Sequence, residues 1–576
     1  MGSVSRDENS QALAGTSNSA DAGSVQHDAG LRIPSVALLA VLVLICLTPF
    51  LSKAYHIDDT LFVWAAQQIA KHPWNPYGFD VVWYTVPQHM WAVTQNPPLA
   101  SYYIAAIAGI LGWSETVLHA GFLLAALGAI LGTYLLARRL TRRPLLAAVA
   151  TLAAPGFLVS STTVMCDIMM LALWVFAILF WLDALDRRKP LLLAVSGVLI
   201  AVCALTKYFG MALIPMLLVY SIVRRRRVES WIVYLLLPVV ALAGYQYWTN
   251  MLYGRGLLDS ALQYAHTRNS VDLYKALVGL SFTGGCALPA LTFAPVVWSR
   301  RRILLAGAAA VIAGLLVRTG ILSMPSNIAP DHRTVLSLQM VLFIAGGLGV
   351  LALAFSDWRR RQDAGSVLLL LWVLGTWGFA SFVNWSVNAR SVLPMIPAVG
   401  ILLARRFELV EGLAGKLAMA KWVVPLVVSA AISLWVAWAD ATLANSSRLA
   451  AEYVRDRLSA PGEKVSFEGH WGFQYYMQAF RFQPVDFRNF TYRDGDLVVV
   501  PHNNSNAAVE SIPPFLVASQ ETFAFPIKTR VSTMSLAWGS GFYSDVWGPL
   551  PYAFGPAYFE VYTALRLRVP PEQSRK

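Results

Sequence analysis

Long apolar runs recur along most of this chain, and they constrain its fold more than any other feature. Hydrophobic residues make up 57% of the 576 residues and charged residues only 13%, whereas a soluble globular domain carries about 25% charged residues. In lipid every backbone polar group needs an internal partner, so these runs are expected to form transmembrane helices. We place spans near residues 31–52, 115–137, 144–160, 166–185, 190–206, 208–223, 230–249, 276–297, 303–322, 335–355, 366–385, 391–404 and 422–439.

Short basic clusters separate the apolar runs and predict how the chain is oriented. They fall in every second loop, which is the positive-inside pattern and accounts for the net charge of +13 without a nucleic-acid partner. The basic loops are therefore expected in the cytoplasm, with the N-terminus inside and the C-terminus outside. The clusters are Arg138-Arg139 with Arg142-Arg143, Arg187-Arg188-Lys189, Arg224 to Arg227, Arg300 to Arg302, Arg359 to Arg361, and Arg405-Arg406 with Lys416 and Lys421.

A short apolar stretch at residues 97–112 decides the number of spans. Counting it as a span would invert every later loop and place the basic clusters outside, so we interpret it as a juxtamembrane or re-entrant helix on the outer side. The resulting prediction is an α-helical polytopic protein of the cell (inner or plasma) membrane, with about thirteen transmembrane helices. Four cysteines without CxxC spacing indicate neither a disulfide framework nor a zinc site.

The distribution of apolar runs also divides the chain into parts. Residues 1–30 are rich in Ser, Ala, Asp and Gly, so we expect a disordered cytoplasmic segment, followed by an uncleaved first anchor. Residues 31–440 form the transmembrane domain, which includes a large outer loop at residues 53–114. Residues 441–576 are expected to fold as a small extracytoplasmic α/β domain, with a helix at Leu449 to Leu458 and strands at Lys464 to Glu468 and Leu497 to Pro501.

Two adjacent carboxylates, Asp58 and Asp59, stand where the chain leaves the first span. Charged groups at membrane depth are costly and usually functional. One carboxylate could act as a general base while the other orients it or binds a cation. The alternative is a solvated helix N-terminus, because Asp caps helices and the following residues have a helical pattern.

Other polar residues of the outer side form a wider set of candidates. Asp167 could orient a substrate or simply cap a helix, and Asn96 lies in a Pro- and aromatic-rich segment typical of a membrane interface. His266 is a weak metal candidate, and a divalent metal is the only cofactor that we consider. Outer cations run against the positive-inside trend, so they are candidates for binding phosphate, although each could instead extend to lipid headgroups; they are Lys207, Arg318, Arg333 and Arg390.

The order of these motifs resembles a known family. One span precedes an outer loop that opens with the acidic pair and continues to NPPL; then follow LLARRL, an outer Asp, LTK and, late in the chain, NARSVLPMIPAVGILLARR. This resembles the lipid-linked glycosyltransferases of the GT-C class, in the branch of protein O-mannosyltransferases and bacterial lipid A aminoarabinose transferases. The resemblance covers about residues 31–440.

The resemblance implies roles for individual residues. Asp58 matches the proposed catalytic base, and Asp59 matches the second acid, where Glu is more usual. Asp167 matches the acid of the second outer loop, and Lys207 matches a Lys expected near the donor phosphate. Arg390 matches the Arg of a late motif, although Ser391 stands where an aromatic residue is common. Gln95-Asn96 replaces the acid-Lys pair of the aminoarabinose branch, which argues against its full donor site.

These roles lead to a functional hypothesis. The chain is expected to be a hexosyl- or pentosyltransferase of the cell envelope that moves a sugar from a polyprenyl-phosphate donor to an acceptor hydroxyl, with inversion. Its partners would be that donor, a lipid, glycan or protein acceptor, and membrane lipids. The alternatives are a transporter or lipid flippase, which would be expected to show repeated halves and broken helices at the middle of the membrane, and a non-catalytic scaffold that displays the C-terminal domain.

Overall fold

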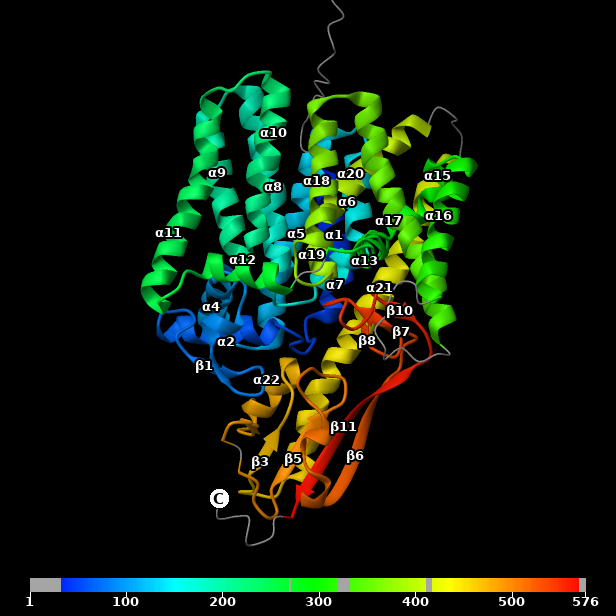
Figure 1. The fold of residues 1–576 in the computed structure, drawn as a ribbon. Coiled ribbons are helices and arrows are strands. Elements are labelled where there is room, and N and C mark those ends of the chain that lie inside the picture. The colour runs from blue at the N-terminus through cyan, green and yellow to red at the C-terminus, as the bar shows by residue number, and fades with distance from the viewer. Residues whose placement is uncertain (1–32, 269–270, 320–331, 411–416, 490, 569–576) are drawn as a thin grey trace, which may run out of the picture.

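A bundle of apolar helices carries a smaller sheet-containing domain at one end (Figure 1). The computed structural model describes residues 33–268, 271–319, 332–410, 417–489 and 491–568. The segment predicted to be disordered, residues 1–30, lies outside them. Within the described residues, eight helices are long and apolar enough to cross a membrane. The chain is therefore an α-helical, multi-pass membrane protein with a C-terminal α/β domain, as predicted.

The helices of the first half of the chain are α1 (Ile33–Leu47), α2 (Asp59–Lys71), α3 (Met90–Val93), α4 (Leu99–Leu111), α5 (Glu115–Leu140), α6 (Pro144–Leu152), α7 (Pro155–Ser160), α8 (Cys166–Arg187), α9 (Pro190–Thr206), α10 (Leu213–Arg225), α11 (Leu236–Tyr253) and α12 (Leu257–Arg268). Those of the second half are α13 (Leu273–Cys286), α14 (Pro289–Thr292), α15 (Ala294–Val297), α16 (Arg300–Arg318), α17 (Arg333–Arg361), α18 (Ala364–Phe382), α19 (Ala389–Val392), α20 (Ile396–Val410), α21 (Leu417–Tyr453) and α22 (Trp471–Ala479).

Each predicted span coincides with one or more of these helices, but several are interrupted. The span predicted at 144–160 is split into α6 and α7, the one at 276–297 into α13, α14 and α15, and the one at 391–404 into α19, a 3₁₀ turn (Leu393–Met395) and α20. A proline lies within each of these breaks or after it. Proline interrupts a helix because its ring clashes with the preceding turn and because it lacks an N–H. The count of about thirteen spans stays a prediction.

Residues 53–114, which we predict to form an outer loop, make a layer at one end of the bundle (Figure 1). It contains α2, the hairpin of β1 (Asp80–Val82) and β2 (Pro87–His89), α3 and α4. Helix α4 corresponds to the short apolar stretch at residues 97–112, which we did not count as a span. It lies beside α2 at the end of the bundle that carries the C-terminal domain (Figure 1). We call this end of the bundle the domain end. The basic C-terminal ends of α10 and α17 lie at the opposite end.

Helix α21 links the bundle to the C-terminal domain without a break. We predicted a span ending at 439 and a separate helix from Leu449, but α21 runs to Tyr453 and ends in a π turn (Val454–Leu458). The predicted strands are confirmed as β3 (Val465–Phe467) and the fully buried β5 (Leu497–Pro501). The other strands are β4 (Gln483–Pro484), β6 (Val517–Ile527), β7 (Val531–Ser532), β8 (Met534–Ser535), β9 (Ser540–Gly541), β10 (Ala553–Phe554) and β11 (Tyr558–Leu567).

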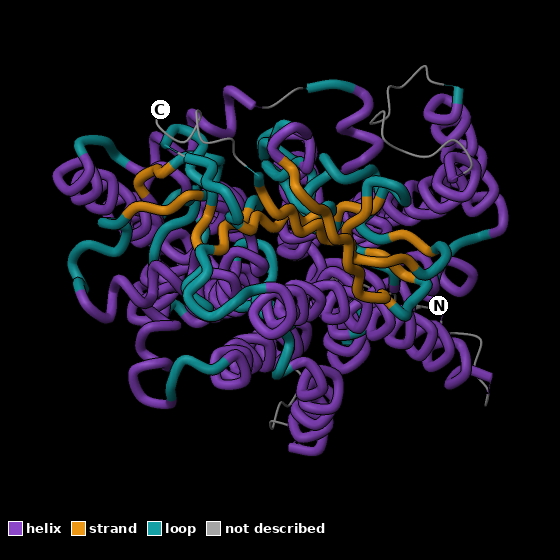
Figure 2. The backbone as a smooth tube through the Cα atoms, turned by 90° about the horizontal axis from the view of Figure 1, so that it is seen from below, coloured by secondary structure: helices purple, strands orange, loops and turns teal. Residues whose placement is uncertain are grey.

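The C-terminal domain has a five-stranded mixed sheet of order β4-β3-β5-β11-β6. Strands β3, β4 and β5 are parallel, and β11 is antiparallel to both β5 and β6. Viewed from the domain end, the strands form a band across the ends of the helices (Figure 2). Residues 529–555, which include β7 to β10, leave this sheet and pack against the bundle; we call them the wedge segment.

Glycines allow α13 and α17 to approach closely inside the bundle. A Cβ atom on Gly284 would lie 1.8 Å from the carbonyl oxygen of Phe343, and one on Gly347 would lie 2.2 Å from that of Leu280. Small residues allow this kind of approach in membranes, where packing rather than water exclusion drives helix association.

We therefore expect Gly284→Ala to destabilise the protein by about 1–3 kcal/mol, because the added methyl forces the two helices apart. The measurement is the thermal unfolding midpoint in detergent. Gly375→Ala on α18 is the matched control, since its methyl would enter open space and Ala favours a helix more than Gly does. Equal midpoints for the two variants would contradict the close approach.

Candidate functional site

The acidic pair lies at the start of α2, where the backbone is strained. Ile57 adopts a positive φ of 47°, which is unusual for a β-branched residue and is often found at functional sites. Asp58 occupies the N-cap position, but its side chain makes no capping hydrogen bond among the described residues. Its carboxylate is 26% exposed and lies 2.9 Å from Nη1 of Arg390. Among the described residues, Asp58 therefore takes the N-cap position without a capping hydrogen bond from its side chain, which pairs with Arg390 instead.

Asp59 plays a different part, because it is completely buried. Its carboxylate accepts hydrogen bonds from the backbone N–H of His56, at 2.8 Å, and from that of Val164, at 2.7 Å. These bonds fasten the acidic turn to the loop between α7 and α8. Burial raises the pKa of Asp59 to about 7, against the opposing effect of Lys53 and the two N–H donors. Both of its carboxylate oxygens are occupied by these backbone hydrogen bonds.

Asp167 and Lys207 form a second ion pair beside the first. Asp167 lies in the first turn of α8, and its Oδ1 is 2.5 Å from Nζ of Lys207, which follows α9. The Asp167 side chain is 1% exposed and that of Lys207 is 18% exposed. Oδ2 of Asp167 is buried without a hydrogen-bond partner among the described residues, so the pair keeps unused acceptor capacity.

Arg390 joins the two acids into one site. It lies in α19 after Asn388, whose side chain caps that helix by accepting from the N–H of Ser391. Nη1 contacts Asp58 and the sulfur of Met165, both at 2.9 Å, and Nε is buried without a described partner. Asp58 and Asp167 both act electrostatically on this guanidinium. Asp58, Asp167, Lys207 and Arg390, predicted from distant parts of the sequence, thus converge at the domain end.

The remaining predicted residues lie near this cluster or away from it. Asn96 is near, because its Oδ1 accepts from Sγ of Cys166 at 3.7 Å, one residue before Asp167. Arg318 and Arg333 are exposed at the ends of α16 and α17, on the side of the bundle away from α2 (Figure 1). His266 is exposed on α12. Among the described residues, no group of three or more His, Cys, Asp or Glu side chains could hold a metal ion.

A buried ion pair close to Asp59 escaped the sequence analysis. Nζ of Lys53 lies 2.6 Å from Oδ2 of Asp440 in α21, and both side chains are completely buried. Lys53 also donates to Thr162, and Asp440 accepts from the hydroxyls of Thr533 and Tyr543. The sequence does contain a signal for this pair. Lys53 stands at the end of the first apolar run and Asp440 directly after the last one, and charged residues at membrane depth usually have a partner.

The burial of Asp59 predicts how pH affects stability. A carboxyl whose pKa is raised on folding contributes stability that is fully present below its unfolded pKa, near 4, and is lost as the pH rises through the folded pKa, near 7. The stability advantage of the wild type over Asp59→Asn should therefore shrink between pH 4 and pH 7, by up to about 1 kcal/mol per pH unit. Thermal unfolding in detergent across this range measures it, and a constant difference would contradict a buried, proton-binding Asp59.

Comparison with known proteins gives a match to one family model. Residues 95–248 match the family described as dolichyl-phosphate-mannose-protein mannosyltransferase. The matched range contains Asn96, Asp167 and Lys207, whereas Asp58 and Arg390 lie outside it. A search among curated proteins gives no match.

Several solved structures are similar to the chain. The oligosaccharyltransferase of Archaeoglobus fulgidus, tethered to an acceptor peptide, has 15% identity and a TM-score of 0.47 over 78% of this chain, which spans 63% of its length. ArnT from Cupriavidus metallidurans, bound to undecaprenyl phosphate, has 15% identity and a TM-score of 0.43 over 82% of this chain and 93% of its own. The arabinofuranosyltransferase AftD from Mycobacteria has 14% identity and a TM-score of 0.42, over 95% of this chain and 40% of its own. The family match, over residues 95–248, agrees with the resemblance to protein O-mannosyltransferases that the order of the motifs indicated.

Proposed function

We propose that this chain is a membrane glycosyltransferase that moves a sugar from a polyprenyl-phosphate donor to an acceptor hydroxyl with inversion, and that Asp58 is the base. The observation that carries the proposal is the half-buried Asp58 carboxylate in one site with two cations, Arg390 and Lys207. A base and a pair of phosphate-binding cations are what such a transfer needs. The description of the matching family names a sugar donor of this kind, dolichyl-phosphate-mannose.

The two ion pairs suit the capture of a donor phosphate. Each cation is held by a carboxylate, and Nε of Arg390 and Oδ2 of Asp167 are buried without a hydrogen-bond partner in the part of the chain that the structure describes. A phosphate that enters between Lys207 and Arg390 would complete the hydrogen bonding of the guanidinium, whose planar fork matches phosphate oxygens. Arg390 would then divide its interaction between the phosphate and Asp58, which leaves the exposed carboxylate oxygen free to meet the acceptor.

The transfer itself is a displacement at the anomeric carbon. The acceptor oxygen forms a bond to that carbon while the bond from the carbon to the phosphate oxygen breaks, and the electron pair remains on the departing polyprenyl phosphate. Asp58 takes the proton of the acceptor hydroxyl. Lys207 and Arg390 stabilise the charge that develops on the phosphate. Attack from the face opposite the phosphate inverts the configuration.

The division between Asp58 and Asp59 follows from their burial. The Asp58 carboxylate is exposed enough to reach an acceptor, as a base must be. The Asp59 carboxylate is buried and accepts two backbone hydrogen bonds. Asp59 then keeps the acidic turn in place and holds the loop that leads to Asp167. These contacts also stabilise the positive φ of Ile57, because Ile57 lies in the same turn, between His56 and Asp58.

We expect Asp58→Asn to fold normally and to lose at least about 100-fold in sugar transfer, the lower range for removal of a general base. The assay incubates purified protein in detergent with a panel of polyprenyl-phosphate sugars and measures the release of free polyprenyl phosphate. The panel also identifies the donor.

The matched control is Asp80→Asn, an exposed carboxylate of the same outer loop that pairs with His89 instead of Arg390. It should transfer sugar at the wild-type rate. Equal turnover by Asp58→Asn and the wild type would remove Asp58 as the base. Release of the lipid phosphate by none of the proteins, across an adequate panel, would favour the transporter or scaffold.

A further inference from the structure

The wedge segment of the C-terminal region pairs with the backbone just before Arg390. The N–H of Ala389 donates to the carbonyl of Phe542, and the N–H of Asp545 donates to the carbonyl of Val387, both at 2.9 Å. Residues 387–389 and 542–545 are more than 150 positions apart in the chain. Two backbone bonds in opposite directions therefore hold the entry to α19 against the wedge segment.

The side chain of Asp545 strengthens this contact. Its Oδ1 accepts from the N–H of Val387 at 3.1 Å, and its Oδ2 lies 2.9 Å from Nζ of Lys275 in α13. The carboxylate is only 6% exposed. A buried carboxylate is costly unless it is paired and hydrogen-bonded. Here one oxygen holds the N–H of residue 387, three positions before Arg390, and the other is paired with Lys275.

Tyr543 contacts the site directly. The guanidinium carbon of Arg390 lies 5.7 Å from the centre of the Tyr543 ring, within the range of a cation–π interaction. The same ring meets the His56 ring edge to face at 5.2 Å, and its hydroxyl donates to Asp440 at 2.8 Å. The Tyr543 side chain therefore contacts Arg390, His56 and Asp440.

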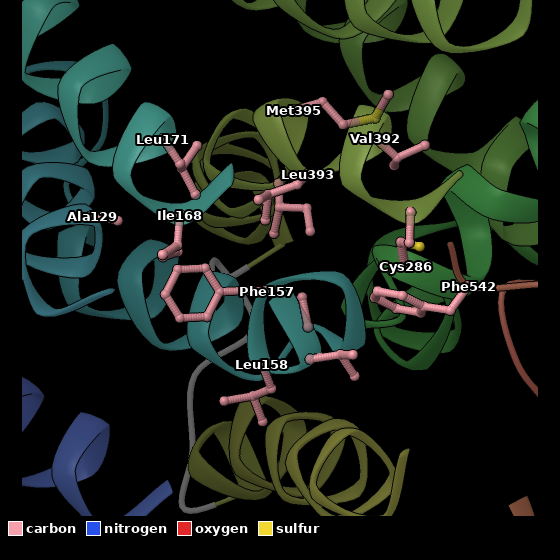
Figure 3. Close-up of a cluster of buried hydrophobic side chains, with 14 of the residues drawn as sticks. Ala129, Phe157, Leu158, Ile168, Leu171, Cys286, Val392, Leu393, Met395 and Phe542 are labelled. Atoms are coloured by element: carbon pink, nitrogen blue, oxygen red, sulfur yellow. The ribbon is translucent and has the colours of Figure 1, made fainter. Parts of the chain in front are cut away.

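The wedge segment is firmly anchored in the bundle. Phe542 is buried in the same apolar cluster as Phe157, Leu158 and Cys286 (Figure 3). Nearby, the hydroxyl of Tyr552 donates to the carbonyl of Gly285 at 3.2 Å. The residues that reach Arg390 thus project from a packed support, which gives them the rigidity that a positioning role requires.

We propose that the wedge segment is a positioning element of the phosphate-binding site, in which Asp545 and Tyr543 fix the place and direction of Arg390. The inference rests on the proposed function, because it assigns to the C-terminal region a part in donor binding. Apolar packing alone would attach the domain to the bundle. It would not call for a buried carboxylate on the backbone at residue 387 or for a ring against the guanidinium.

The first test examines the contact without any ligand. Hydrogen exchange at residues 386–392 is compared between the wild type, Asp545→Ala and Val546→Ala. Val546 is 61% exposed next to Asp545 and serves as the matched control. We expect faster exchange at Val387 and Ala389 in Asp545→Ala alone, because each of these N–H groups is held by the wedge segment. Unchanged exchange would overturn the proposal.

The second test measures the consequence for Arg390, with undecaprenyl phosphate as the probe. Asp545→Ala should weaken its binding by about tenfold, a mid-range coupling between contacting residues. In an Arg390→Ala background the same substitution should change binding by less than about twofold, because the group that it positions is gone. Additive losses would indicate a merely structural role and would overturn the proposal.

Further variants separate the possible failures. Asp545→Asn keeps an acceptor for the N–H of Val387, so it should retain part of the binding even if Asp545→Ala folds poorly. Tyr543→Phe keeps the ring and should bind more tightly than Tyr543→Leu. Absence of binding by the wild type would refute the donor class of the proposed function, and the hydrogen-exchange comparison alone would then decide whether the wedge segment holds Arg390.

Discussion

A buried ion pair between Lys53 and Asp440 underlies the arrangement of the site. Two charges with no exposure are tolerated only when they are paired and hydrogen-bonded, and this pair makes hydrogen bonds to two further regions, the loop before α8 and the wedge segment. It joins the end of the first span to α21, to the loop before α8 and to the wedge segment. The acidic turn begins three residues after Lys53, so the position of Asp58 depends on this connection.

The site contains two kinds of charged group, which differ in how deeply they are buried. Asp59 and Asp545 are buried, and each accepts a backbone N–H that belongs to a loop of the site. Asp58, Lys207 and Arg390 remain partly exposed and form ion pairs with one another or with Asp167. A guanidinium and an ammonium each carry several N–H donors, so each cation can contact a phosphate while it keeps part of its contact with a carboxylate. In the proposed reaction the buried groups keep the framework in place while the partly exposed ones change partners.

Hydropathy and charge predicted much of the fold, because a membrane leaves few alternatives for an apolar chain. They located the apolar helices, the β3 and β5 strands and four residues that meet in the site, although not the breaks within three of the predicted spans. They did not separate Asp58 from Asp59, because burial depends on contacts with the distant residue Val164. Arg318 and Arg333 are candidates only because they are predicted to lie at the outer face of the membrane. That prediction does not tell where around the helix bundle a residue lies. The wedge segment has no local signal, because pairing between residues 387 and 545 is a property of the tertiary fold.

In the proposed reaction, Arg390 and Lys207 receive the phosphate of a lipid-linked sugar donor beside Asp58. The most direct measurement is an experimental structure of the protein with undecaprenyl phosphate bound. Our account predicts phosphate density in contact with both Lys207 and Arg390, with the guanidinium shifted from Asp58 towards the phosphate. Phosphate density elsewhere on the protein, with the Asp58–Arg390 and Asp167–Lys207 pairs unchanged, would contradict it.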